Sequence, residues 1–101
     1  MKTRRVRFTA TAQRHVRRER RWWLENRDHV EIFAVEMREA IRIVKLLPGA
    51  GGAYRHTRIE GLRRIYLSKV ACHLYYTFDD DEVLVRALWG AHRGRGPVLA
   101  R

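Results

Sequence analysis

Residues 9–49 read TATAQRHVRRERRWWLENRDHVEIFAVEMREAIRIVKLLPG, and this stretch decides the fold because it predicts two consecutive amphipathic helices. Thr9 or Thr11 is suited to cap the first helix, which we expect to end near Asn26. Spacings of three and four residues place the following side chains on one face of it: Ala12, Val16, Glu19 or Arg20, and Trp23. That face should pack on the rest of the protein.

The second helix has its own start and stop signals. Asp28 is a candidate cap, with Glu31 three residues later in a capping-box arrangement, and Pro48-Gly49 ends the helix. Its apolar stripe comprises Phe33, Met37, Ala40, Ile41, Val44 and Leu47. Because almost no chain separates the two helices, they should form an antiparallel hairpin.

Five other segments are predicted to be strands. They are Arg4–Thr9, Tyr54–Ile59 (an edge strand), Leu62–Lys69, His73–Phe78 and Glu82–Trp89. Alternation along the last segment predicts Val83, Val85, Ala87 and Trp89 on one face. The expected fold class is α+β in one domain over residues 1–101, with an N-terminal strand, a helical hairpin and an antiparallel sheet of three or four strands. The hairpin should cover one face of the sheet and leave the other to solvent or a partner.

The composition is strongly basic. The 101 residues include 22 Lys and Arg against 11 Asp and Glu, a net charge of +11. Ten basic and two acidic residues lie within residues 1–27, so this quarter of the chain carries +8. Such a charge predicts an acidic partner, either nucleic acid or an acidic protein.

Other counts exclude several classes of protein. No apolar run approaches the ~18 residues of a membrane helix, so we expect no membrane association and a cytoplasmic location. Cys72 is the only cysteine, which excludes an internal disulfide. The five histidines are scattered, and Gly49–Gly52 is not followed by the Lys-Ser/Thr of a phosphate loop. We therefore expect neither a metal site nor a cofactor.

The arginines of the first helix leave two interpretations open. They lie opposite its apolar face and comprise Arg14, Arg17, Arg18 and Arg21. They are either a solvated face or a surface for phosphates or a carboxylate-rich partner.

At this point the sequence resembles a known family, the RelE/ParE superfamily of type II toxin–antitoxin toxins. The matching pieces span nearly the whole chain and are VRFTATA (6–12), WWLENR (22–27), LPG (47–49), YRH (54–56), GLRR (61–64), LYY (74–76), ALW (87–89) and RGRGP (93–97). WWLENR and RGRGP are more similar to the ParE branch than to the RelE branch.

The resemblance implies a bacterial toxin that a small acidic antitoxin neutralises by direct binding, in a hetero-oligomer. ParE-like toxins are non-enzymatic inhibitors of DNA gyrase, which is the function we expect here. The expected target-binding residues are Trp89, His92, Arg93 and Arg95. The expected antitoxin-binding residues are Arg14, Arg17, Arg18, Arg21, Arg63 and Tyr75. The exposed sheet face and the groove of the helical hairpin should be covered in that complex.

RelE-like toxins, in contrast, resemble ribosome-dependent endoribonucleases, and this is the alternative function. Their pattern has Arg where His73 stands, Arg where Arg93 stands, and a tail Tyr or His at about Leu99. Only Arg93 matches, so we do not expect an intact ribonuclease site. If the chain is a ribonuclease, its candidates are Arg93, His92, Arg63 (or Arg64) and His73, since imidazole titrates near neutrality.

A third hypothesis does not depend on the target of either branch. A nucleic-acid-binding module built on the basic first helix should bind duplex DNA with an affinity that falls steeply with salt.

Overall fold

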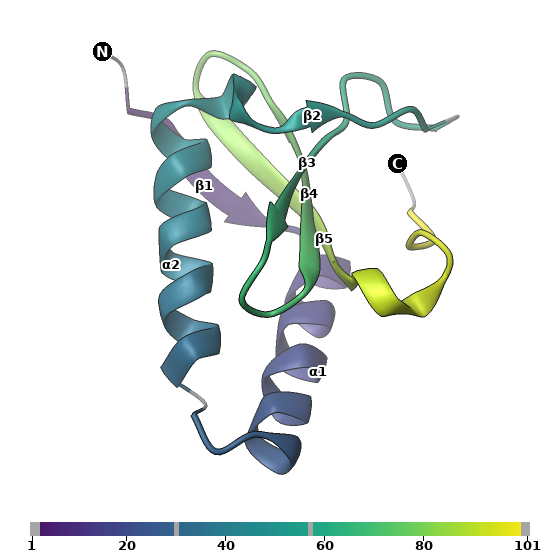
Figure 1. Cartoon of the computed structure of the whole chain (residues 1–101). Coiled ribbons are helices and arrows are strands. Elements are labelled where there is room, and N and C mark those ends of the chain that lie inside the picture. Colours follow the sequence, from purple (N-terminus) through teal and green to yellow (C-terminus); the bar gives the residue numbers. More distant parts are fainter. Residues whose placement is uncertain (1–2, 30, 57, 100–101) are drawn as a thin grey trace.

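The computed structural model describes residues 3–29, 31–56 and 58–99. Its five strands form one sheet in the order β1-β5-β4-β3-β2, with the two helices on one side of it (Figure 1). The strands are β1 (Arg5–Phe8), β2 (Gly52–Ala53), β3 (Arg63–Leu67), β4 (Cys72–Phe78) and β5 (Glu82–Gly90). Strands β2 to β5 are antiparallel, as expected, whereas β1 joins the edge of β5 in parallel. The α+β prediction is confirmed.

Helix α1 (Ala10–Asn26) and helix α2 (Glu31–Leu46) form the predicted antiparallel hairpin (Figure 1). Of the two candidate caps for α1 the structure uses Thr9, whose hydroxyl accepts a hydrogen bond from the Ala12 amide at 3.0 Å. The predicted cap Asp28 is separated from the start of α2 by His29 and residue 30, and residue 30 lies outside the described residues.

The hairpin packs on what we call the inner face of the sheet. Trp23 from α1 and Phe33 and Met37 from α2 are buried there, as the helical periodicity predicted. They pack in one cluster with Leu74 from β4 and Leu88 from β5. The Tyr76 hydroxyl ties the end of α2 to the sheet because it donates to the Pro48 carbonyl at 2.6 Å and accepts from the Gly51 amide at 2.9 Å.

The edge strand lies earlier in the chain than predicted. Strand β2 consists of Gly52 and Ala53, which pair with β3, and the described residues of the predicted strand Tyr54–Ile59, which are 54–56, 58 and 59, form no strand. After Tyr54, whose amide donates to the Leu62 carbonyl at 2.8 Å, the chain instead crosses the other side of the sheet, which we call the outer face. Ile59 and Leu62 are buried on that face. The expectation of a free outer face is therefore wrong in part.

A β-bulge in β5 changes which side chains share a face. Tyr75 pairs with Ala87 and Tyr76 pairs with Val85, so Arg86 has no partner in the ladder. Beyond this extra residue, the alternation of β5 side chains between the two faces of the sheet is inverted. Ala87 and Trp89 consequently lie on the outer face, opposite Val83 and Val85. The prediction that these four residues share a face is wrong for that reason.

No helix in the described part of the chain is long and apolar enough to cross a membrane. Within the same residues, no group of three or more His, Cys, Asp or Glu side chains could hold a metal ion.

Candidate functional site

The chain after β5 folds back against the protein instead of extending into solvent. This C-terminal segment, residues 91–99, begins with a 3-10 turn (Ala91–Arg93) and returns across the outer face (Figure 1). Its Leu99 is only 3% exposed and packs with Tyr75 and Trp89. The segment is fixed at its start because the Ala91 amide donates to the Ala71 carbonyl at 2.8 Å.

Trp89 is the centre of this region. Its indole is 8% exposed, and Nε1 donates to the Arg95 carbonyl at 2.6 Å. Three guanidinium carbons surround the ring, with Arg18 at 4.9 Å, Arg93 at 4.8 Å and Arg95 at 6.0 Å from its centroid. We call these three residues the arginine cluster. Of the predicted target-binding residues, Trp89, Arg93 and Arg95 are thus brought together, and Arg18 joins them from α1.

A cavity of about 300 Å³ opens between the outer face and the C-terminal segment. We call it the tail cavity; its polar and aromatic lining comprises Tyr54, Arg64, His73, Tyr75, Trp89 and Arg95. Arg64 stacks on Tyr54, with 4.7 Å between guanidinium carbon and ring centroid, and its Nη1 donates to the Tyr75 hydroxyl at 3.4 Å. The Tyr54 and Tyr75 rings meet edge to face at 5.1 Å. Cations beside aromatic rings are the groups that bind nucleotides and their phosphates.

Of the titratable groups in the tail cavity, His73 is the one able to accept a proton at neutral pH. Burial and the neighbouring Arg64 both lower the pKa of His73 below its usual 6.5. The imidazole is therefore neutral at pH 7, which is the form that a general base needs.

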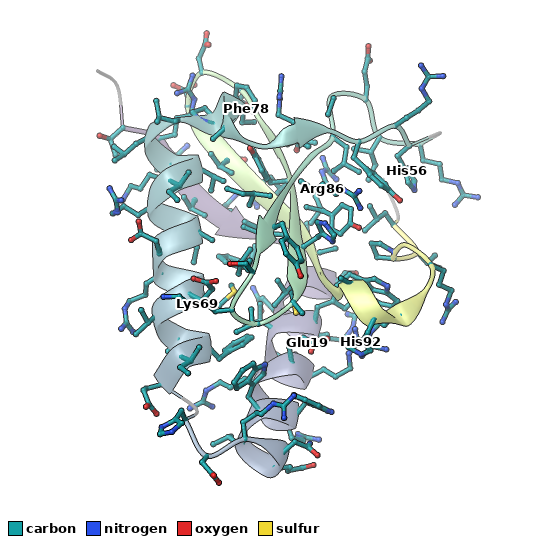
Figure 2. All side chains as sticks on the ribbon, viewed as in Figure 1. Glu19, His56, Lys69, Phe78, Arg86 and His92 are labelled. Carbon is teal, nitrogen blue, oxygen red and sulfur yellow. The ribbon has the colours of Figure 1, made fainter. Side chains whose placement is uncertain are left out.

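The other expected catalytic residues do not reach the tail cavity. Arg93 turns toward α1, where its Nη2 lies 3.5 Å from Oε1 of the buried Glu19. His92 instead lines a different cavity together with Glu19 and Lys69, and all three residues are labelled in Figure 2. Arg63 donates to the Gly51 carbonyl at 2.6 Å and so supports the turn before β2.

Two buried groups near the arginine cluster, His15 and Cys72, have pKa values far from their usual ones. The His15 ring meets Trp89 edge to face at 5.3 Å, and its Nδ1 accepts from the Leu88 amide at 3.3 Å. Burial, with the positive charges of Arg18, Arg14 and Arg93, lowers the pKa of His15 to about 4. Burial, with the negative Glu19, raises the pKa of the Cys72 thiol to about 12, so this thiol is not a nucleophile at neutral pH.

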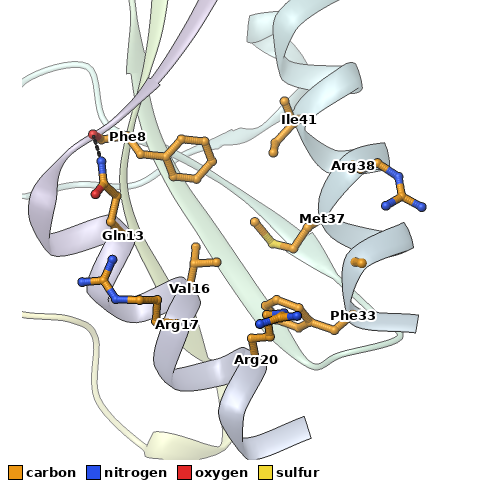
Figure 3. Close-up of a pocket in the computed structure, with 10 residues that line it drawn as sticks. Phe8, Gln13, Val16, Arg17, Arg20, Phe33, Met37, Arg38 and Ile41 are labelled. Atoms are coloured by element: carbon orange, nitrogen blue, oxygen red, sulfur yellow. Dashed lines mark hydrogen bonds between the residues drawn. The ribbon is translucent and has the colours of Figure 1, made fainter. Parts of the chain in front are cut away.

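A second surface lies between the two helices, on the opposite side of the sheet from the tail cavity. This helix groove has a volume of about 460 Å³ and a floor of apolar side chains that includes Phe8, Val16, Phe33, Met37 and Ile41 (Figure 3). Arg17 and Arg20 extend from α1 and Arg38 from α2 at its rim (Figure 3). None of its described lining residues is acidic.

The predicted antitoxin-binding residues do not form one surface. Of Arg14, Arg17, Arg18 and Arg21, all exposed, only Arg17 lines the helix groove. Arg18 belongs to the arginine cluster, Arg63 supports a turn, and Tyr75 is buried on the outer face. The predicted antitoxin-binding set does not include two groove residues, Arg20 and Arg38. The signal that could have found them is that Arg20 lies four residues after the apolar Val16 and Arg38 directly follows Met37.

Comparison with solved structures identifies the fold. No protein-family model and no curated protein sequence matches the chain. A chain of the chromosomal ParDE TA system from P. aeruginosa superposes with a TM-score of 0.70 and 11% identity, over 89% of this chain and 98% of that one. The chain has the RelE/ParE fold. A chain of the YoeB dimer from Staphylococcus aureus superposes with a TM-score of 0.61 and 13% identity, over 87% and 97% of the two chains.

Proposed function

We propose that this protein is the toxin of a type II toxin–antitoxin system. The observation that carries the proposal is the shared fold with a ParDE system and with YoeB over nearly the full length of each. The net charge of +11 and the basic helix groove support it, because both suit a small acidic neutralising partner.

The antitoxin segment that fits the helix groove is an acidic amphipathic helix. Its apolar face would pack on Phe33, Met37 and the neighbouring apolar floor, and its acidic residues would pair with Arg17, Arg20 and Arg38 at the rim. Guanidinium–carboxylate pairs at a rim steer association more than they add affinity. Substituting Arg17 and Arg38 with Gln should therefore slow association and weaken its dependence on salt. An antitoxin with a basic toxin-binding segment would contradict this assignment.

We propose DNA gyrase as the target, with the toxin acting by binding and without catalysis. The support comes from the C-terminal segment. Arg93, the one residue that matches the RelE-like catalytic pattern, faces Glu19 and not the tail cavity. The RGRGP stretch of the ParE-like pattern instead presents Arg95 at the surface beside Trp89. Trp89, Arg93 and Arg95 are the proposed target-facing residues, and His92 lines the neighbouring cavity beside Glu19.

One observation favours the RelE-like alternative, ribosome-dependent mRNA cleavage. The tail cavity holds a neutral His73 beside Arg64 and Arg95, which is a set able to accept a proton and to stabilise negative charge on a phosphate. In this alternative the candidate catalytic residues are His73 and Arg64, in place of His92 and Arg63.

Two assays with the purified toxin separate the functions. Supercoiling of a relaxed plasmid by gyrase reports gyrase inhibition. Primer extension on mRNA in a translating extract reports cuts at the ribosomal A site. We expect inhibition of supercoiling, no mRNA cuts, and full relief of inhibition by the antitoxin encoded beside this gene. His73→Gln, which removes the base from the tail cavity, should leave gyrase inhibition intact. Cleavage of mRNA that His73→Gln abolishes would instead establish the alternative.

A further inference from the structure

The arginine cluster concentrates positive charge at a junction between distant parts of the chain. Arg18 comes from the middle of α1, and Arg93 and Arg95 come from the C-terminal segment. Each guanidinium carbon lies within 6.0 Å of the centroid of the Trp89 ring, so any two of them are within twice that distance. The indole fixes all three, because cation–π contacts hold guanidinium groups against its surface.

This charge is only partly neutralised within the protein. Glu19 lies 3.5 Å from Arg93, but it is buried at 4% exposure and offers nothing to solvent. Arg18 and Arg95 are exposed, and no salt bridge joins either of them to a carboxylate in the described part of the chain. The neighbouring His15 responds to this positive potential, since Arg18 and Arg93 are among the charges that lower its pKa.

Three guanidinium groups in this arrangement match a row of phosphates. Guanidinium forms paired hydrogen bonds with phosphate oxygens, and its planar shape fits that geometry better than an ammonium does. One strand of duplex DNA presents a phosphate about every 3.4 Å along the helix axis. Because the three guanidinium groups gather around one ring, they can face neighbouring phosphates of one strand.

We propose that Arg18, Arg93 and Arg95 form a binding site for the phosphate backbone of duplex DNA. Contacts to phosphates carry no base information, so this site should bind duplexes of different sequence with similar affinity. The choice of duplex DNA rests on the proposed function, in which the target enzyme holds a DNA duplex. The site would then let the toxin contact enzyme and DNA together.

The test measures binding of a fluorescent 20-base-pair duplex by anisotropy between 50 and 300 mM salt, without gyrase. Contacts to three phosphates predict a slope of about −2.7 for log affinity against log salt. The variant Arg18→Gln/Arg95→Gln should reduce the magnitude of the slope by about 1.8 and weaken binding at least tenfold at 100 mM salt. In an NMR titration the Trp89 indole N–H, which is bonded to the Arg95 carbonyl, should shift when wild-type protein binds the duplex.

The matched control is Arg5→Gln/Arg42→Gln, which removes the same charge from two exposed positions, on β1 and α2, that lie outside the helix groove and away from Trp89. It should weaken binding less than threefold and keep the slope. Circular dichroism and thermal unfolding establish that both variants are folded. The proposal is overturned if the duplex does not bind at 50 mM salt, if both double variants behave alike, or if single-stranded RNA binds more tightly than the duplex. A toxin that binds DNA as expected but leaves supercoiling unaffected would retain this site and refute the gyrase assignment.

Discussion

Acidification should destabilise this protein through His15. The imidazole has a pKa of about 4 in the folded protein, against 6.5 when it is free in the unfolded chain. Between these values the unfolded state binds a proton that the folded state does not bind. Stability is therefore intact above pH 6.5 and falls as the pH drops toward 4. The full loss is at most about 3.4 kcal/mol, and roughly 2 kcal/mol of it should fall between pH 7 and pH 5.

Urea unfolding at pH 7 and pH 5, followed by circular dichroism, measures this loss. The informative comparison is with His15→Asn, because the Asn side-chain oxygen can replace Nδ1 as acceptor for the Leu88 amide but does not titrate. Wild type should lose roughly 2 kcal/mol more than His15→Asn over this interval. The exposed His29 provides the control, since His29→Asn should behave as wild type. Equal losses in wild type and His15→Asn would refute the reasoning.

Three further outcomes follow from single contacts. Tyr76→Phe leaves the Pro48 carbonyl and the Gly51 amide without their partner, which should cost about 1–3 kcal/mol and lower the melting temperature by at least about 4 °C in a thermal scan. Thr9→Ala removes the α1 cap and should cost about 1 kcal/mol in urea unfolding; a cost under 0.3 would count against the cap. The Cys72 thiol should resist iodoacetamide at pH 8 until the protein unfolds, as intact-mass measurement with and without urea would show.

The sequence pattern was sufficient to predict those elements that are determined by residues close to one another in the chain. Thr9, the helical spacing that ends at Trp23 and the Pro48 stop all act within a few residues of the element they define. The predictions of the two helices, the hairpin and the positions buried on it are confirmed for that reason, except that Leu47 follows the end of α2 and is 56% exposed. The edge strand was misplaced because Gly52 and Ala53 become a strand only by pairing with β3, a contact that no local pattern encodes.

The candidate site depended on contacts between distant residues. Arg18 occupies the solvent side of its helix by periodicity, and only the return of the C-terminal segment places it beside Arg93. His92 and Arg93 are adjacent in sequence and both lie beside Glu19, but it is Arg93 whose guanidinium stacks on the Trp89 ring. The sequence therefore indicated the segment that follows Trp89, whereas the set of side chains that meet at the Trp89 ring depends on the tertiary fold.

The sequence by itself determined the charge, the two amphipathic helices and the strands that follow them, because these depend on composition and on the spacing of apolar side chains. The tertiary structure alone decided where Trp89 points. The bulge at Arg86 arises from pairing between β4 and β5, and it inverts the alternation beyond it. Without that extra residue Trp89 would lie on the inner face under the helices. With it, the indole faces the C-terminal segment and gathers the three arginines into one site.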